Sequence, residues 1–306
     1  MAVVDDPEQQ LAWEARQRPR AGIASILAAI LSLGGTLWSQ AIFRDVPSAG
    51  FLESLEHAAE PGPLGRVESV RVAFFQFYED HATTILASAV ARGIGLLALG
   101  WAVTFLAVAV RARKPEFAKA AVYIALVGAV LSAVSTVLGA FGSSVAVSDF
   151  LDGPRTVDDA SDIASNSLLV TGQFVGLAGQ LALATGTVLI ALNAMRVGLL
   201  TRFLGILGMI TGALIVIPIG PLPVVQAFWL FAMGLLFLGR MPGGPMPPAW
   251  RTGNAEPWPS QQKVAEERRK QAEARRTGST PPEEDELVPA GPEHPSSKKR
   301  KRKRRG

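Results

Sequence analysis

The chain has 306 residues, of which 49% are hydrophobic and 18% are charged, and its formal net charge is +4. Soluble globular domains carry about 25% charged residues, and here the apolar residues form runs long enough to cross a bilayer as helix. This composition excludes a soluble enzyme, a disulfide scaffold and a disordered protein. The absence of cysteine from the sequence also excludes disulfides, thiol catalysis and cysteine-ligated metal centres.

Six apolar runs predict an all-α fold, a polytopic transmembrane helix bundle with six spans. Backbone groups in hydrocarbon must be bonded within their own helix or in a closed barrel, and the short alternating segments of a barrel are missing. We expect an N-terminal segment at 1–20, a transmembrane domain at 21–239 and a tail at 240–306. The predicted spans are 21–43, 82–110, 118–148, 168–195, 203–219 and 222–239.

Charges next to the spans predict their orientation. Arginine and lysine gather before the first run and at 111–119, 196–202 and 240–306, whereas loops 44–81 and 149–167 are acidic. Basic segments stay in the cytoplasm. The alternation therefore predicts an even number of spans with both termini cytoplasmic. A cleaved signal peptide is a less favoured interpretation of the first run, because acidic residues precede it.

The outer loop 44–81 has helical periodicity in two places. Residues 48–60 predict a short helix, which the Pro-Gly-rich stretch 61–65 ends. A second, amphipathic helix follows, which either lies on the headgroup region or caps the bundle. Because 66–110 contains no proline, we expect this helix to run into the second span without a break.

Acidic and histidine side chains in the same loop offer oxygen and nitrogen ligands for a metal. A solvated acidic face is the more common meaning of such a pattern, so we expect no metal and no cofactor. The residues concerned are Glu53, Glu56, His57, Glu79, Asp80 and His81.

Arg92 is the one charged residue away from the ends of a predicted span. One interpretation places it at the outer edge of the hydrocarbon, where its long side chain reaches water. The other places it in a polar cavity, paired with Asp149, Asp162 or Glu79, because intramembrane charges often mark functional sites. The sequence leaves both open.

Three glutamines extend the second interpretation. Gln173 and Gln180 are seven residues apart and share a helix face, and Gln226 lies near the outer end of the last run. Together with Arg92 they form a candidate substrate-binding site. Interhelical hydrogen bonds are the structural alternative. The spans contain no carboxylate, which argues against a proton-coupled carrier.

The tail changes composition after the last run. Residues 241–248 are rich in proline and glycine, Trp250 and Trp258 suit the inner interface, and 261–276 predict a polar helix. Residues 277–297 predict disorder. The eight bases before the final glycine predict binding to anionic lipid headgroups, with a ribosome or nucleic acid as the alternative partner. These bases are Lys298, Lys299, Arg300, Lys301, Arg302, Lys303, Arg304 and Arg305.

The sequence MRVGLLTRFLGILGMITGALIVIPIGPLPVVQAFWLFAMGLLFLG at 195–239, the following PPAW and EPWPS, and DPEQQLAWEARQRPRAG at 6–22 resemble uncharacterised six-span membrane proteins of actinobacteria. The resemblance covers most of residues 5–260. It implies a bacterial inner-membrane location. It implies no activity, so no functional residue is carried over from it.

Three functions remain open from the sequence. The first is a structural or regulatory membrane protein whose polybasic tail contacts lipid or a partner. The second is a small-solute transporter or channel with a polar site around Arg92, and the third is a membrane-insertion factor with a ribosome-contacting tail. The sequence contains no Walker, HExxH or G-x-S-x-G motif, so we expect no enzyme.

Overall fold

The computed structural model describes residues 7–47, 69–241, 246–258 and 269. The described part is 82% helical and contains no strand. The chain divides into two units, one of residues 1–240 and 246–258 and the other of residues 241–245 and 259–306. Only Met241 and Arg269 of the second unit are described, so the fold below is that of the first unit.

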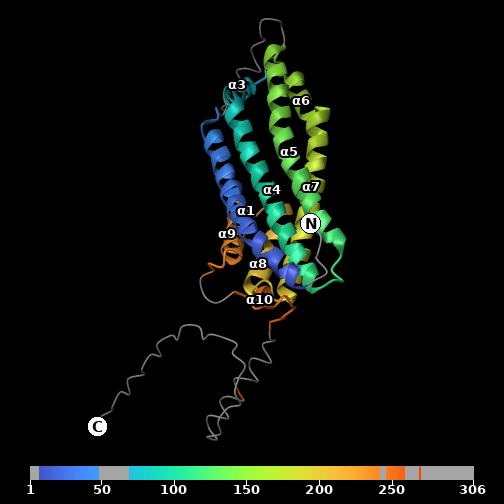
Figure 1. Cartoon of the computed structure of the whole chain (residues 1–306). Helices are drawn as coiled ribbons and strands as arrows, with labels where there is room; N and C mark the ends of the chain where they lie inside the picture. Colours follow the sequence, from blue (N-terminus) through green and yellow to red (C-terminus); the bar gives the residue numbers. More distant parts are fainter. Residues whose placement is uncertain (1–6, 48–68, 242–245, 259–268, 270–306) are drawn as a thin grey trace, which may run out of the picture. The chain divides into compact units, whose positions relative to one another are not determined.

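Four long helices and several short elements make up this unit (Figure 1). The long helices are α1 (Pro7–Ile42), α4 (Ala82–Arg113), α5 (Lys119–Asp152) and α7 (Ser167–Arg196). The short elements are η1 (Phe43–Asp45), α3 (Val72–Asp80), α6 (Val157–Ser165), α8 (Arg202–Val216), α9 (Val224–Phe237) and α10 (Ala249–Thr252).

The four long helices pack side by side in the order α1, α4, α5, α7. The short helices α8 and α9 form a hairpin that connects the two ends of this row, because α8 packs on α7 and α9 packs on α1. The indole nitrogen of Trp229 on α9 donates a hydrogen bond to the carbonyl oxygen of Leu204 on α8, 3.0 Å away, and joins the two arms of the hairpin.

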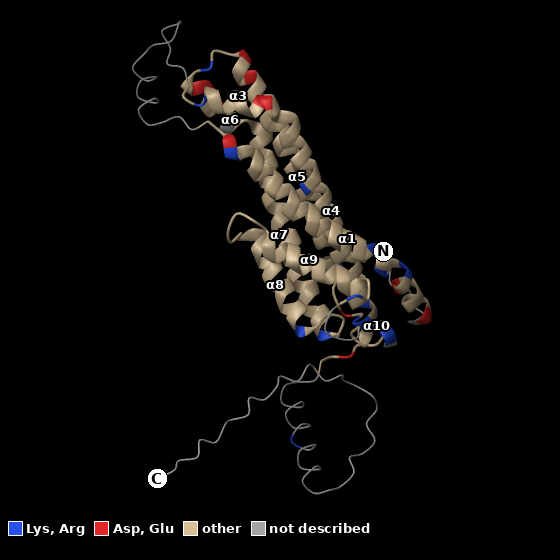
Figure 2. Ribbon diagram, turned by 90° about the vertical axis from the view of Figure 1, so that its left-hand side faces the viewer, with Lys and Arg blue, Asp and Glu red and all other residues tan. Residues whose placement is uncertain are grey.

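The four long helices are long and apolar enough to cross a membrane. The helices α8 and α9 are also apolar but are too short. With 15 and 14 residues, α8 and α9 extend only about 22 Å and 21 Å, against a hydrocarbon thickness of about 30 Å. Figure 2 shows the α8–α9 loop about halfway along the long helices. The structure thus contains four candidate spans and a shorter hairpin, and six complete spans remain a prediction.

Two boundaries differ from those predicted. Helix α1 already begins at Pro7, so the predicted first span is the second half of a longer helix. The expected unbroken helix over 66–110 is wrong, because α3 ends at Asp80 and α4 begins at Ala82. His81 forms the break, with its ring stacked on Phe77 at 4.2 Å between centroids and its Nδ1 2.8 Å from the Phe77 carbonyl oxygen.

Acidic and basic residues lie mostly at opposite ends of the bundle (Figure 2). We call the end with α3 and α6 the acidic end and the end with α10 the basic end. At the acidic end, α3 covers the bundle through Phe75 and Tyr78, which pack on Phe150 and Val147 of α5. Helix α6 starts with a capping box between Thr156 and Asp159.

Glycines let the long helices approach closely. A Cβ added to Gly128 of α5 would meet the backbone nitrogen of Leu183 and lie 2.8 Å from the carbonyl oxygen of Gly179, both on α7. On α8, a Cβ at Gly208 would lie 2.8 Å from the Ala191 side chain of α7. Lipid provides little hydrophobic drive for helix association, so such close packing supplies much of the stability.

The Gly128→Ala substitution should therefore destabilise the bundle by about 1–3 kcal/mol, because the α7 backbone must move to admit the methyl group. The control is Gly139→Ala on the same helix, where an added Cβ has nothing within 4 Å. Thermal unfolding in detergent should show a lower midpoint for Gly128→Ala only. Equal midpoints for the two variants would contradict the proposed role of close α5–α7 packing.

At the basic end, a buried ion pair joins α1 to α4. Arg113 donates to both carboxylate oxygens of Glu14, at 2.8 and 2.9 Å, and the two side chains are only 0% and 3% exposed. Arg113 also donates two hydrogen bonds to the carbonyl oxygen of Ala249 and lies over the Trp250 ring. A buried charge needs such complete pairing.

Trp250 is packed into the basic end of the bundle and is 5% exposed. Its sequence context instead suggests a position at the inner membrane interface. Its side chain contacts the rings of Phe105 and Phe237, and its indole nitrogen donates to the Leu199 carbonyl oxygen at 2.9 Å. The prediction was wrong because burial of the indole beside Arg113 depends on contacts between distant parts of the chain.

Replacing Glu14 by Gln should cost about 3–5 kcal/mol, because the charge of Arg113 would stay buried without its counter-ion. Chemical or thermal unfolding in detergent measures this loss. Glu116→Gln, at an exposed carboxylate, serves as the control and should change stability by less than about 0.5 kcal/mol. A Glu14→Gln variant as stable as the control would disprove the structural role of the pair.

Several sequence predictions lie outside the described residues. They are the helix at 48–60, the ligand candidates Glu53, Glu56 and His57, the tail helix at 261–276 and the basic run at 298–305.

Candidate functional site

A pocket of about 670 Å³ lies where the α8–α9 loop meets the row of long helices. Its volume falls within the range of about 300–1,000 Å³ that is typical of small-molecule sites. Four long helices and the hairpin all contribute to its walls. The loop that closes one side contains Pro218, Pro221 and Pro223, and Gln40 of α1 holds it by donating to the Pro221 carbonyl oxygen at 2.9 Å.

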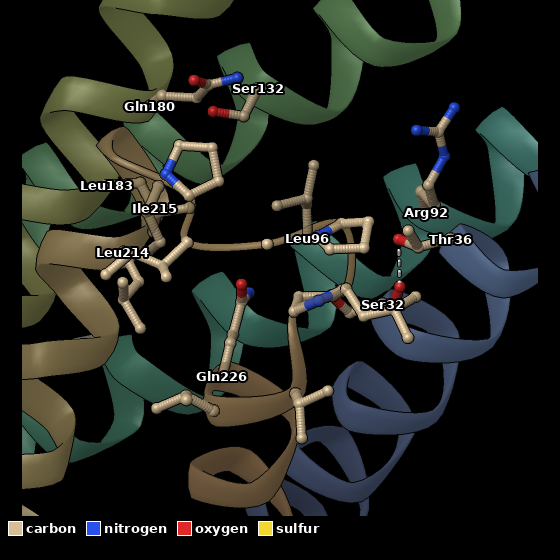
Figure 3. Close-up of a pocket in the computed structure, with 18 of the residues that line it drawn as sticks. Ser32, Thr36, Arg92, Leu96, Ser132, Gln180, Leu183, Leu214, Ile215 and Gln226 are labelled. Carbon is tan, nitrogen blue, oxygen red and sulfur yellow. Dashed lines mark hydrogen bonds between the residues drawn. The ribbon is translucent and has the colours of Figure 1, made fainter. Parts of the chain in front are cut away.

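Polar side chains reach the pocket from five helices (Figure 3). Arg92 lies on the α1 side beside Thr36, and Gln180 and Ser132 lie together on the α7 side. Gln226 projects from α9 between them. The full polar lining is Ser32, Thr36, Arg92, Ser132, Thr136, Gln180 and Gln226.

The rest of the lining is apolar. Leu96 and Leu183 come from α4 and α7, and Leu214 and Ile215 come from the end of α8. The proline-rich loop and the first turn of α9 complete this surface. The pocket thus pairs a small polar group of side chains with a larger apolar wall, which is the usual composition of a ligand site.

Three of the four predicted site residues line the pocket, and the fourth does not. Arg92, Gln180 and Gln226 all line this pocket, although they belong to α4, α7 and α9. Gln173 is exposed and does not belong to the lining. It lies on the same face as Gln180 but about 10 Å farther along α7 toward the acidic end.

Arg92 has no ion pair in the described part of the chain. Its Nε atom is buried without a hydrogen-bond partner there, and the suggested partner Glu79 accepts instead from Ser148 at the acidic end. Asp149 and Asp162 line a separate small pocket. The expected pairing of Arg92 with one of these three acids is therefore absent among the described residues.

The stem of Arg92 lies against α1. A Cβ added to Gly35 would lie 2.7 Å from the Cγ atom of Arg92, so the missing side chain at Gly35 leaves room for the arginine. Figure 3 shows the guanidinium on the α1 side of the pocket, directed away from Gln226.

Ser132 is the second polar side chain of the pocket lining that has a buried atom without a partner in the described structure. It is 3% exposed, and its Oγ has no hydrogen bond in the described structure. The neighbouring hydroxyls of Thr136 and Thr36 donate to backbone carbonyls of their own helices, at 2.8 Å each. A buried hydroxyl without a partner costs free energy, so Ser132 is a candidate contact for a ligand or water.

The pocket lies level with the middle of an exposed apolar surface. On α5, exposed apolar side chains extend from Tyr123 to Val145, which is about 33 Å of helix. Ser132 lies about 14 Å from Tyr123, and Thr136 lies about 14 Å from Val145. On α4, Arg92 lies between the exposed side chains of Val90 and Ile94.

Sequence reasoning missed the α1 wall of the pocket. Ser32 and Thr36 are one helical turn apart and so share a face, but the same pattern occurs in many helices that only hydrogen-bond their own backbone. No group of three or more described His, Asp or Glu side chains is arranged to hold a metal ion.

Comparison of the chain with protein-family models, with curated proteins and with solved structures finds no match.

Proposed function

We propose that this protein is a membrane-embedded carrier or receptor that binds a small molecule in the pocket beside the α8–α9 loop. The observation that carries the proposal is that Arg92, Gln180 and Gln226, from three helices, line one pocket that lies level with the exposed apolar surface of α4 and α5. Structural glutamines and arginines in membranes normally bond to neighbouring helices. Arg92 Nε and Ser132 Oγ lack such partners in the described structure and remain available for a ligand.

The half-length hairpin supports the same function. Transporters often place their substrate site near the bilayer midplane, where non-helical backbone is tolerated because it lines a cavity. The loop between α8 and α9 has this character, because Pro218, Pro221 and Pro223 lie in the pocket wall.

The natural absence of cysteine permits a direct test. In lipid vesicles, Thr136→Cys in the pocket should react with a hydrophilic, uncharged maleimide roughly ten times faster than Val134→Cys, or more, because a thiol facing hydrocarbon does not ionise. Val134 is the matched control, since it lies two residues away on the same helix and is 45% exposed on its outer side.

A second control is Ser88→Cys, at a fully buried position of α4 outside the pocket. It should react as slowly as Val134→Cys. If Thr136→Cys reacts no faster than these two variants, the pocket is not accessible to water and the proposed function is wrong.

The basic tail favours a second role, contact with anionic lipid. The observation is the run of eight consecutive bases at 298–305. Each base close to an anionic surface contributes about 1 kcal/mol, which is enough for the run to hold the tail at a membrane. In this role the tail contributes a structural or regulatory contact in addition to the ligand site.

Deleting 298–305 should weaken association of the protein, held in phosphatidylcholine nanodiscs, with phosphatidylglycerol vesicles by about tenfold or more at low salt. The control is deletion of the eight residues 287–294, which contain no lysine or arginine. Equal association of both deletions would disprove the lipid contact. Loss of binding to RNA, with no change for vesicles, would identify nucleic acid as the partner instead.

A further inference from the structure

We infer that the ligand of this pocket is an anionic amphiphile, with a phosphate or carboxylate head held by Arg92 and an apolar body against the α8–α9 hairpin. This inference rests on the proposed function and names the ligand class for the same site. Three features of the pocket carry it: an uncompensated positive charge, a mostly apolar wall and an opening bordered by apolar side chains.

The charge comes first. An arginine guanidinium is always protonated and is costly at hydrocarbon depth without a counter-ion. Arg113 of the same helix meets this need with Glu14, whereas no described acid pairs with Arg92. Guanidinium groups bind planar anionic oxygens in pairs. An anion supplied by the ligand would neutralise Arg92 in the way that Glu14 neutralises Arg113.

The wall comes second. In addition to Arg92, the pocket is lined by Leu96, Leu183 and Leu214 and by the prolines of the loop. A small hydrated anion would lose its water shell there without compensation from these side chains. An alkyl chain would instead gain from contact with them. The combination selects a ligand that has one charged end and one apolar end.

The opening comes third. Ile219, Val224 and Val225 line the pocket on the hairpin side and are 81%, 55% and 37% exposed. The ends of the helix row, α1 and α7, are joined by the short hairpin and show no extended packing on each other in the described structure. Side chains of this kind favour contact with an apolar group over contact with water, so the opening suits the apolar end of an amphiphile.

Figure 3 shows the stem of Arg92 beside Thr36 and its guanidinium directed away from Gln226. The apolar wall is formed by Leu96, the hairpin and α7. A head group on Arg92 would therefore lie on the α1 side of the pocket, and the apolar body of the ligand would extend toward Leu96 and the loop.

The test measures protection of Thr136→Cys from the uncharged maleimide in phosphatidylcholine vesicles. Decyl phosphate should halve the labelling rate at a concentration about ten times lower than that needed for neutral decyl maltoside, because only the phosphate pairs with Arg92. Inorganic phosphate should protect far less than decyl phosphate. The uncharged reagent avoids effects of the amphiphile on the surface potential.

Substitution then assigns the preference to Arg92. In the Thr136→Cys background, Arg92→Gln should remove the preference for decyl phosphate, whereas Arg111→Gln at the other end of α4 should keep it. If Arg92→Gln does not fold, the comparison of the three probes on the Arg92 protein still decides the charge and amphiphile requirements.

Three results would overturn the inference and leave the proposed function in place: equal protection by decyl maltoside, equal protection by inorganic phosphate, or a preference that survives Arg92→Gln. The second of these would identify a free anion as the ligand. An unreactive Thr136→Cys would overturn both the inference and the proposed function, so the two failures are distinguishable.

Discussion

The shortness of α8 and α9 is the constraint on which the rest of the structure depends. Helices of 15 and 14 residues cannot accompany helices of 30 or more residues along their whole length. The hairpin therefore joins α1 to α7 near the basic end and turns back beside the middle of the long helices. The pocket forms at this turn, because the loop carries prolines that cannot continue either helix.

Arg113 and Arg92 lie on the same helix, α4, but their side chains have different surroundings. Arg113 is fully buried, and its charge and donors are met by Glu14, a carbonyl oxygen and an indole ring. Arg92 lies in the apolar part of the same helix with a buried Nε that has no partner in the described structure. The first pattern is that of a structural contact between helices. The second is typical of a charge that a ligand or water completes.

Close helix packing forms one wall of the pocket. Gly128 and Gly179 bring α5 and α7 together immediately beside Ser132, so the α5–α7 wall has little freedom to move. In a membrane, such backbone contact replaces the hydrophobic drive that holds soluble cores together. A rigid wall of this kind favours one ligand shape over others.

The local sequence predicted which segments are helical. It did not predict where α3 and α4 are separated or which side chains lie level with the hairpin loop. The apolar runs predicted every long helix, because the length of a run and its hydropathy are local properties. The break at His81 was missed, since it depends on the stacking of one ring on Phe77 and not on a proline or glycine. Gln173 was grouped with Gln180 on the basis of helix periodicity, yet only Gln180 lies level with the hairpin loop.

The sequence by itself determined that the chain is a bundle of apolar helices with basic and acidic ends. The hydropathy and the charge of each segment can be read without knowing which other segments pack against it. It also singled out Arg92, because a charge in an apolar run is visible locally. Only the tertiary structure decided that Arg92, Gln180 and Gln226 share a pocket, and that Glu14 neutralises Arg113, 99 residues away. Both outcomes depend on which helices are neighbours and how far each extends, and these are set by packing between distant segments.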